Sequence, residues 1–212
     1  MMMKYDLIIV TRSTTDYLID MTQRCIDSAK ADRVIIVETG QVVPYKNIDV
    51  YTQYPGKFNY NACLNWGLEF AENDIHILAN NDLIFHKYQS IWEDMVNNGF
   101  ASGSAWYNGC LLPQGDFIYE GYDIGLQMTG WCIFITKETY RTIGLIDEGV
   151  DFWYSDNLYA DQLKRHGLRH GLFCNARVDH ICNQTLNTMP VRVKREYSIG
   201  QLVKYESCRK RK

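Results

Sequence analysis

The chain has 212 residues, the length of one generous domain or of a domain with an appended tail. Hydrophobic residues make up 46% and charged residues 22%, so the chain can bury a substantial core without disulfide or metal staples. The net charge of −3 does not by itself indicate a nucleic-acid binder. No apolar run approaches the ~20 residues that cross a bilayer as a helix.

Charge is unevenly distributed along the chain. Residues 191–212 contain eight Lys or Arg and two Glu, a net charge of +6, so the first 190 residues carry −9. We therefore divide the chain into a domain over 1–190 and a basic C-terminal tail over 191–212. The tail could contact phosphate, anionic lipid headgroups or nucleic acid. A solvated, partly helical terminus explains the same composition, because charge runs are common at chain ends.

Cysteine usage indicates a reducing compartment. The seven cysteines are scattered and form no CxxC pair. The opening residues MMMKYDLIIV hold an acidic residue inside a very short apolar run, unlike a secretion signal. We expect reduced thiols and a cytoplasmic protein, held at a membrane periphery if the basic tail binds an anionic surface.

The first hundred residues alternate strands and helices. Short, β-branched apolar runs predict buried strands at 5–11, 33–40, 48–54 and 75–79. Helical spacing of apolar residues predicts helices within 14–31, 59–74 and 88–100. This alternation predicts an α/β domain, with a mainly parallel central sheet covered by helices on both faces.

The second half has a different character. Residues 101–130 are rich in Gly, Tyr and polar groups, with weak periodicity, and 130–144 predicts a strand followed by a short helix. A further helix is predicted from about Asn157 to His166, ending at Gly167. No repeat or Pro-rich linker interrupts the chain, so a single domain is the economical interpretation.

The stretch HILANNDLIF, residues 76–85, places Asn80, Asn81 and Asp82 at the end of a core strand. In open α/β sheets, ligands bind outside the carboxyl ends of the strands. A carboxylate with neighbouring amides offers oxygen ligands to a divalent cation and hydrogen bonds to sugar or ribose hydroxyls. A turn or a helix cap would use the same residue types.

The order of several short motifs resembles the family-2-type glycosyltransferases of the GT-A fold, a Rossmann-like α/β domain. The motifs are IIVETG, NYNACLNWGLEFAENDIHILANNDLIF, GLIDEGVDFWYSDNLYADQLKRHGLRHGL and ARVDHICNQT, and the resemblance covers roughly residues 5–185. It implies a nucleoside-diphosphate sugar donor bound by residues 1–100, an acceptor bound by 101–190, and a divalent metal, Mn²⁺ or Mg²⁺.

The resemblance implies donor-binding roles for residues of the first half. They are Thr11, Arg12, Glu38, Asn65, Asn80 and Asn81. Glu38 matches an acidic residue that contacts base or ribose, and Thr11 and Arg12 match a nucleotide-facing loop. The alternative interpretations are that Glu38 is a solvated turn residue, that Arg12 is a surface arginine and that Asn65 serves packing alone.

The resemblance also implies the metal ligands and the catalytic base. Asp82 matches the last position of the DxD-like metal motif, and His180 matches a histidine that contacts metal or diphosphate. Asp156 matches the family's general base, although Ser155 replaces the glutamate that precedes it. As a base, the Asp156 carboxylate has to reach the acceptor hydroxyl. The alternative role for Asp156 is to cap the helix that starts at Asn157.

Acceptor-side roles fall on the second half. The resemblance implies that Asp147 and Glu148 face the acceptor, and the aromatic Trp131 and Trp153 flank it, the latter between Phe152 and Tyr154. A glycan, a lipid-linked glycan or a modified nucleic acid would each suit such a site.

Two other functions stay open: a nucleotidyltransferase of related fold, and a non-catalytic module that binds sugar or nucleic acid.

Overall fold

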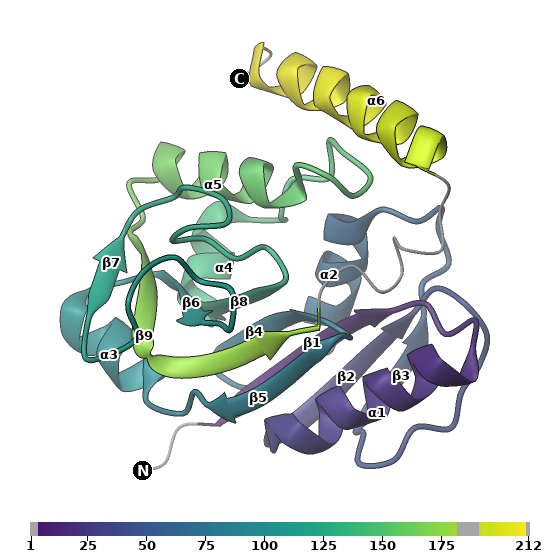
Figure 1. Cartoon of the computed structure of the whole chain (residues 1–212), viewed down its shortest axis with the longest axis horizontal. Helices are drawn as coiled ribbons and strands as arrows, with labels where there is room; N and C mark the ends of the chain where they lie inside the picture. Colours follow the sequence, from purple (N-terminus) through teal and green to yellow (C-terminus); the bar gives the residue numbers. More distant parts are fainter. Residues whose placement is uncertain (1–3, 182–190, 211–212) are drawn as a thin grey trace.

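The strands and helices predicted in the first half are present in the computed structural model, which describes residues 4–181 and 191–210 (Figure 1). In chain order they are β1 (Tyr5–Thr11), α1 (Asp16–Ala29), β2 (Arg33–Glu38), β3 (Val50–Gln53), α2 (Tyr60–Leu68), β4 (Ile75–Asn80), β5 (Leu83–Lys87) and α3 (Ile91–Asn98). The second half contains β6 (Ser102–Trp106), β7 (Ile118–Glu120), β8 (Cys132–Thr136), α4 (Lys137–Ile143), α5 (Ser155–Arg165), β9 (His170–His180) and α6 (Val191–Lys210). Strands β5, β6, β7 and β9 are not among the predicted strands.

The described strands form one mixed sheet in the order β3-β2-β1-β4-β8-β6-β9-β5, with β7 paired to β9. The block β3-β2-β1-β4 is parallel, as the alternation of strands and helices predicts. Strand β8 then runs antiparallel to β4 and β6, and β9 runs parallel to β6 but antiparallel to β5. Because β8 is antiparallel to β4, the loop that enters β8 lies at the carboxyl ends of β1 and β4.

Two hydrophobic cores cover the two faces of the sheet, because successive side chains of a strand point to opposite faces. On β1, Leu7 and Ile9 face the core that α1 and α3 cover, whereas Ile8 and Val10 face the core of α2, α4 and α5. Helix α2 approaches β1 closely, since a Cβ added at Gly67 would lie 2.4 Å from the Cγ2 of Ile8. The predicted α/β class, with helices on both faces, is confirmed.

Local signals set the helix boundaries. Thr15 caps α1 by accepting a hydrogen bond from the Leu18 N–H, and Asn59 caps α2 in the same way. Gly99 ends α3 in the left-handed conformation, with φ of 68°. Helix α5 begins at Ser155, two residues before the predicted start, so that Asp156 lies inside its first turn.

The basic C-terminal segment forms the 20-residue helix α6, which lies over α5 on the outside of the domain (Figure 1). The division at residue 190 stays a prediction, and 182–190 and 211–212 lie outside the described residues. Six cysteines are free in the part of the chain that the structure describes, which excludes Cys182. No helix in the described stretches combines the length and apolarity needed to cross a membrane.

Candidate active site

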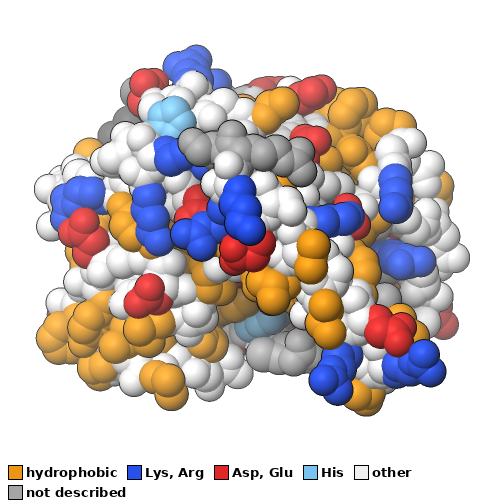
Figure 2. Space-filling view, turned by 90° about the horizontal axis from the view of Figure 1, so that it is seen from above, with side chains coloured by type: hydrophobic (Ala, Val, Ile, Leu, Met, Phe, Trp, Pro, Cys, Tyr) orange, Lys and Arg blue, Asp and Glu red, His pale blue; other side chains and the backbone are white. Residues whose placement is uncertain are grey.

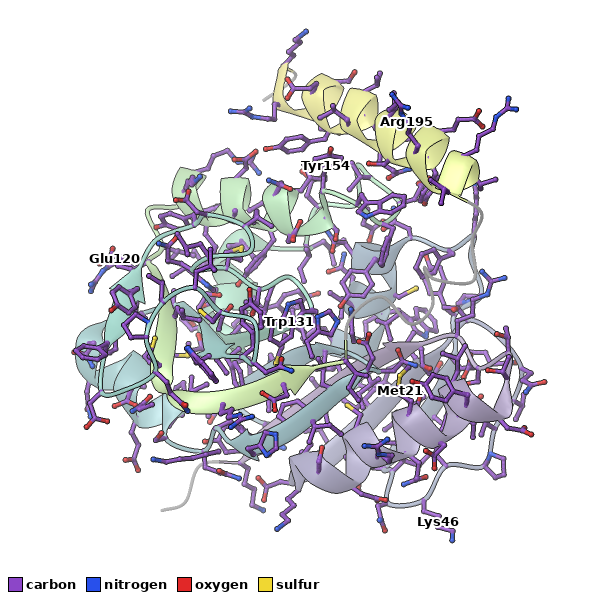
Figure 3. All side chains as sticks on the ribbon, in the orientation of Figure 1. Met21, Lys46, Glu120, Trp131, Tyr154 and Arg195 are labelled. Atoms are coloured by element: carbon purple, nitrogen blue, oxygen red, sulfur yellow. The ribbon has the colours of Figure 1, made fainter. Side chains whose placement is uncertain are left out.

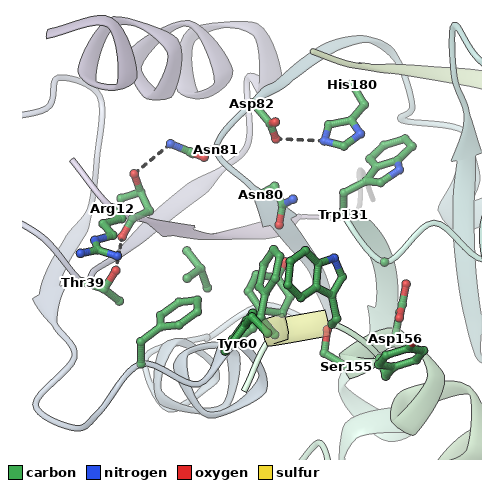
Figure 4. A pocket seen from close by; sticks show the side chains of 18 residues that line it. Arg12, Thr39, Tyr60, Asn80, Asn81, Asp82, Trp131, Ser155, Asp156 and His180 are labelled. Atoms are coloured by element: carbon green, nitrogen blue, oxygen red, sulfur yellow. Dashed lines mark hydrogen bonds and ion pairs between the residues drawn. The ribbon is translucent and has the colours of Figure 1, made fainter. Parts of the chain in front are cut away.

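A cleft of about 480 Å³ opens at the carboxyl ends of β1 and β4 (Figure 4). Its size is typical of small-molecule sites, and its position is where open α/β sheets bind ligands. Nine residues singled out from the sequence line it: Thr11, Arg12, Asn80, Asn81, Asp82, Trp131, Trp153, Asp156 and His180. The fold thus gathers them from β1, β4, β9, α5 and the loops between.

The pair of Asp82 and His180 occupies one side of the cleft. Strand β5 starts at Leu83, which pairs with His180 at the end of β9, so this register brings together two residues far apart in sequence. Asp82 Oδ1 lies 3.2 Å from His180 Nε2, and both side chains are largely buried. The imidazole stacks on Trp131, with ring centroids 4.8 Å apart and planes at 22°.

This pair could supply two ligands to a divalent metal. Among the described residues, no group of three or more His, Cys, Asp or Glu could hold a metal ion. Two protein ligands nevertheless fit a cation that takes its other ligands from phosphate oxygens and water, as Mg²⁺ commonly does. The imidazole makes the pair better suited to Mn²⁺ than to Mg²⁺.

Asn81 stabilises the floor of the cleft beside this pair. It is buried, and its Nδ2 donates hydrogen bonds to Thr11 Oγ1 at 3.0 Å and Thr22 Oγ1 at 2.9 Å. The backbone N–H of Asn80 donates to the Trp131 carbonyl at 2.9 Å, which joins β4 to the loop before β8. Arg12 is exposed at the end of β1, where its guanidinium can reach an anionic ligand.

Asp156 lies on another side of the cleft, in the first turn of α5 (Figure 4). Burial raises the pKa of its carboxyl, against the hydrogen bond that the Asn157 N–H donates to Oδ1 at 2.9 Å. A raised pKa makes this carboxylate a stronger base than a free aspartate. Gly130 leaves the space for it, because a Cβ there would lie 2.5 Å from both Cβ and Oδ2 of Asp156.

Four residues singled out from the sequence lie outside the cleft lining. Asn65 is buried, and its Nδ2 donates to the Ile146 carbonyl and to Glu148 Oε1, both at 2.8 Å. Asp147 Oδ1 accepts a hydrogen bond from the Gly149 N–H at 3.0 Å. These contacts connect α2 to the loop before α5, so Asn65, Asp147 and Glu148 support the wall that carries Asp156.

Glu38, the fourth of these residues, is 1% exposed and bonds to its own surroundings. Its carboxylate accepts hydrogen bonds from the backbone N–H and hydroxyl of Ser13, at 2.9 and 2.6 Å, and from the Gly40 N–H at 2.6 Å. It therefore fixes the loop after β1, the loop that carries Arg12, rather than facing the cleft itself.

Further lining residues carry no signal in the sequence. They are Val10, Thr39, Phe58, Tyr60, Gly130 and Tyr197. The Tyr60 hydroxyl is buried and has no hydrogen-bond partner among the described residues, and burial raises the pKa of this phenol. Tyr197 comes from α6, and only its aromatic ring within a basic segment could have distinguished it.

Comparison with known proteins identifies the fold. No protein-family model matches the chain, and no curated protein matches its sequence. Among solved structures, the chain is similar to GalNAc-T7, crystallised with UDP, GalNAc and Mn²⁺, with a TM-score of 0.69 and 11% identity. The match covers 84% of this chain but 43% of that one. The chain therefore has a GT-A-like fold, as predicted, whereas membership of family 2 stays a prediction.

Proposed function

We propose that this protein is a glycosyltransferase that moves a sugar from a nucleoside-diphosphate sugar to an acceptor hydroxyl. The observation that carries the proposal is the arrangement of one cleft in a GT-A-like fold. An Asp82–His180 pair lies at one side and the half-buried carboxyl of Asp156 at another (Figure 4). The similarity to a protein crystallised with UDP and Mn²⁺ supports a nucleotide-sugar donor.

The donor would lie across the carboxyl ends of β1 and β4. Asp82 and His180 would hold a divalent cation, which neutralises charge on the diphosphate leaving group. Arg12 at the end of β1 would contact the nucleotide or its phosphates, because an exposed guanidinium is well suited to phosphate oxygens. Asn80 would offer its amide to ribose or sugar hydroxyls.

Asp156 would act as general base towards the acceptor. Its carboxylate takes the proton of the acceptor hydroxyl as that oxygen forms its bond to the anomeric carbon. The bond from the anomeric carbon to the diphosphate oxygen breaks, and its electron pair leaves with the diphosphate. A single displacement of this kind inverts the anomeric centre, so NMR of the product should show the opposite configuration from the donor.

The first test of this proposal measures donor binding. Thermal unfolding would be followed with a panel of nucleoside diphosphates and their sugars, with and without Mn²⁺. A ligand at 100 times its Kd stabilises a protein by ~2.7 kcal/mol, a shift of roughly 5 to 10 °C for a chain of this size. We expect a metal-dependent shift with one nucleotide, and its loss in Asp82→Asn.

The second test separates binding from chemistry. Asp156→Asn should keep the nucleotide-dependent shift but lower the transfer rate by about 10²–10⁴. Asp20→Asn, an exposed position on α1 that does not line the cleft, is the matched control and should change neither. Normal transfer in Asp156→Asn would refute the base, and no shift with any nucleotide would favour a non-catalytic binding module.

A further inference from the structure

Helix α6 packs tightly on the loop that precedes α5. Gln201 is 2% exposed, and its Oε1 accepts hydrogen bonds from the backbone N–H groups of Asp151 and Phe152, at 2.6 and 3.3 Å. Its Nε2 donates back to Asp151 Oδ2 at 3.0 Å. Tyr205, 8% exposed, stacks on Tyr154 with ring centroids 5.5 Å apart and planes at 6°.

These contacts fix a strained part of the backbone. Tyr154 adopts the left-handed conformation, with φ of 69°, which is costly for a bulky residue. It lies directly beneath α6 (Figure 3), and the Tyr205 ring covers it. Since Asp156 follows two residues later, α6 contacts the backbone that leads directly to the candidate base.

The same helix contributes a side chain to the cleft. Tyr197 lines it, and its ring centroid lies 5.2 Å from that of Trp153, with planes at 53°. The ring of Phe152 also packs against Trp153, with centroids 5.9 Å apart. An aromatic wall therefore extends from the loop before Asp156 into α6.

We propose that α6 completes the acceptor subsite, with Tyr197 as an acceptor-binding residue and Gln201 and Tyr205 as positioning residues. This inference rests on the proposed function and extends it to a segment that the sequence presents as a basic tail. The wall belongs to the acceptor side because it is continuous with Asp156, whereas Asp82 and His180 lie on a different side of the cleft from Asp156 (Figure 4).

The chemistry of the wall favours a sugar ring as the group that binds there. Flat aromatic rings with polar edges present an apolar surface to the C–H face of a sugar and hydrogen-bonding groups to its rim. A nucleic-acid acceptor would require cationic contacts to phosphates. Among the described residues that line the cleft, Arg12 is the only Lys or Arg, and it lies at the end of β1.

The outer face of α6 provides matched controls. Ile199 and Val203 are 54% and 62% exposed and point away from the domain. Seen from above, the face that carries α6 shows Lys and Arg side chains interspersed with hydrophobic and acidic ones (Figure 2). Substitutions there change the same helix without touching the aromatic wall.

The test measures binding of a panel of p-nitrophenyl glycosides by ligand-observed NMR, and binding of UDP with Mn²⁺ by calorimetry. Tyr197→Ala should weaken binding of at least one glycoside by about tenfold, the usual size of one lost aromatic contact. Val203→Ala should bind that glycoside as the unmodified protein does, and Tyr197→Phe, which keeps the ring but lacks the hydroxyl, should bind it more tightly than Tyr197→Ala. UDP affinity should be the same in all four proteins.

The positioning residues are tested by kinetics. Gln201→Leu should lower kcat of transfer to the bound glycoside more than it raises KM, because it releases the loop that carries Asp156. Tyr205→Phe keeps the stacked ring and should retain the kcat that Tyr205→Leu loses. A merely structural helix would instead lower the melting temperature of these variants with kcat per folded molecule unchanged.

Failure of the inference is distinguishable from failure of the proposed function. If UDP binds but Tyr197→Ala leaves glycoside binding unchanged, or no glycoside binds, α6 is not part of an acceptor subsite and the proposal is overturned. If glycosides bind through Tyr197 while no nucleotide binds, the subsite stands and the proposed transfer reaction fails.

Discussion

Gly130→Ala offers a direct test of how closely the wall of the cleft is fitted around Asp156. The added Cβ would lie 2.5 Å from Cβ and Oδ2 of Asp156, and 2.8 Å from its Cγ. Carbon atoms in contact prefer about 3.5–4.0 Å, so the carboxyl must move by roughly 1 Å. A misplacement of that size can cost about 10²-fold in rate. We expect kcat of transfer to fall about a hundredfold.

The assay compares initial transfer rates with donor binding in the same variant. Gly130 is not among the glycines with positive φ, so alanine fits its backbone and any effect comes from the contact with Asp156. Gly200→Ala is the control, because nothing lies within 4 Å of a Cβ there. Within α6 it should stabilise the protein by about 0.5–1 kcal/mol and leave the rate unchanged. An unchanged kcat in Gly130→Ala would refute the role given to Asp156.

Three further predictions concern stability, each checked by urea unfolding. His170 is fully buried, and burial lowers its pKa to about 4. As the pH falls, His170 is therefore protonated at a higher pH in the unfolded chain than in the folded one. Stability should therefore fall by about 3 kcal/mol from pH 6.5 to pH 4, and His170→Gln should reduce this loss. Burial raises the pKa of Asp6, but hydrogen bonds from His76 and Asn73 outweigh it and leave the pKa lowered. The ionised Asp6 therefore stabilises the fold above pH ~3.9, and this stabilisation is lost as the pH falls through the lower pKa of the folded state. Asp6→Asn should lower the free energy of unfolding by about 1–3 kcal/mol at pH 7 and make it depend less on pH in the acid range. Tyr60→Phe should not destabilise the protein, since no described residue bonds the hydroxyl; a loss above ~1 kcal/mol would contradict this.

The local sequence predicted the parallel half of the fold well. The helices in this half show helical spacing of apolar residues, and a buried parallel strand needs a nearly continuous apolar run, which β1 and β4 both show. The placement of Asn80, Asn81 and Asp82 at a carboxyl strand end follows from the same pattern. The second half was harder to predict, because β6 and β7 are short and are paired with distant strands.

The local pattern is a property of neighbouring residues, so the sequence by itself determined the helices and most strands of the first half, and where the polar ends of those strands fall. Tertiary structure alone decided which distant groups meet. The antiparallel register of β5 and β9 brings His180 to Asp82, and packing of α6 brings Tyr197 to the cleft. Glu38 illustrates the converse, because its local position suits a ligand contact but its carboxylate bonds the loop after β1. Such pairings depend on the complementarity of whole surfaces, which no short stretch of sequence encodes.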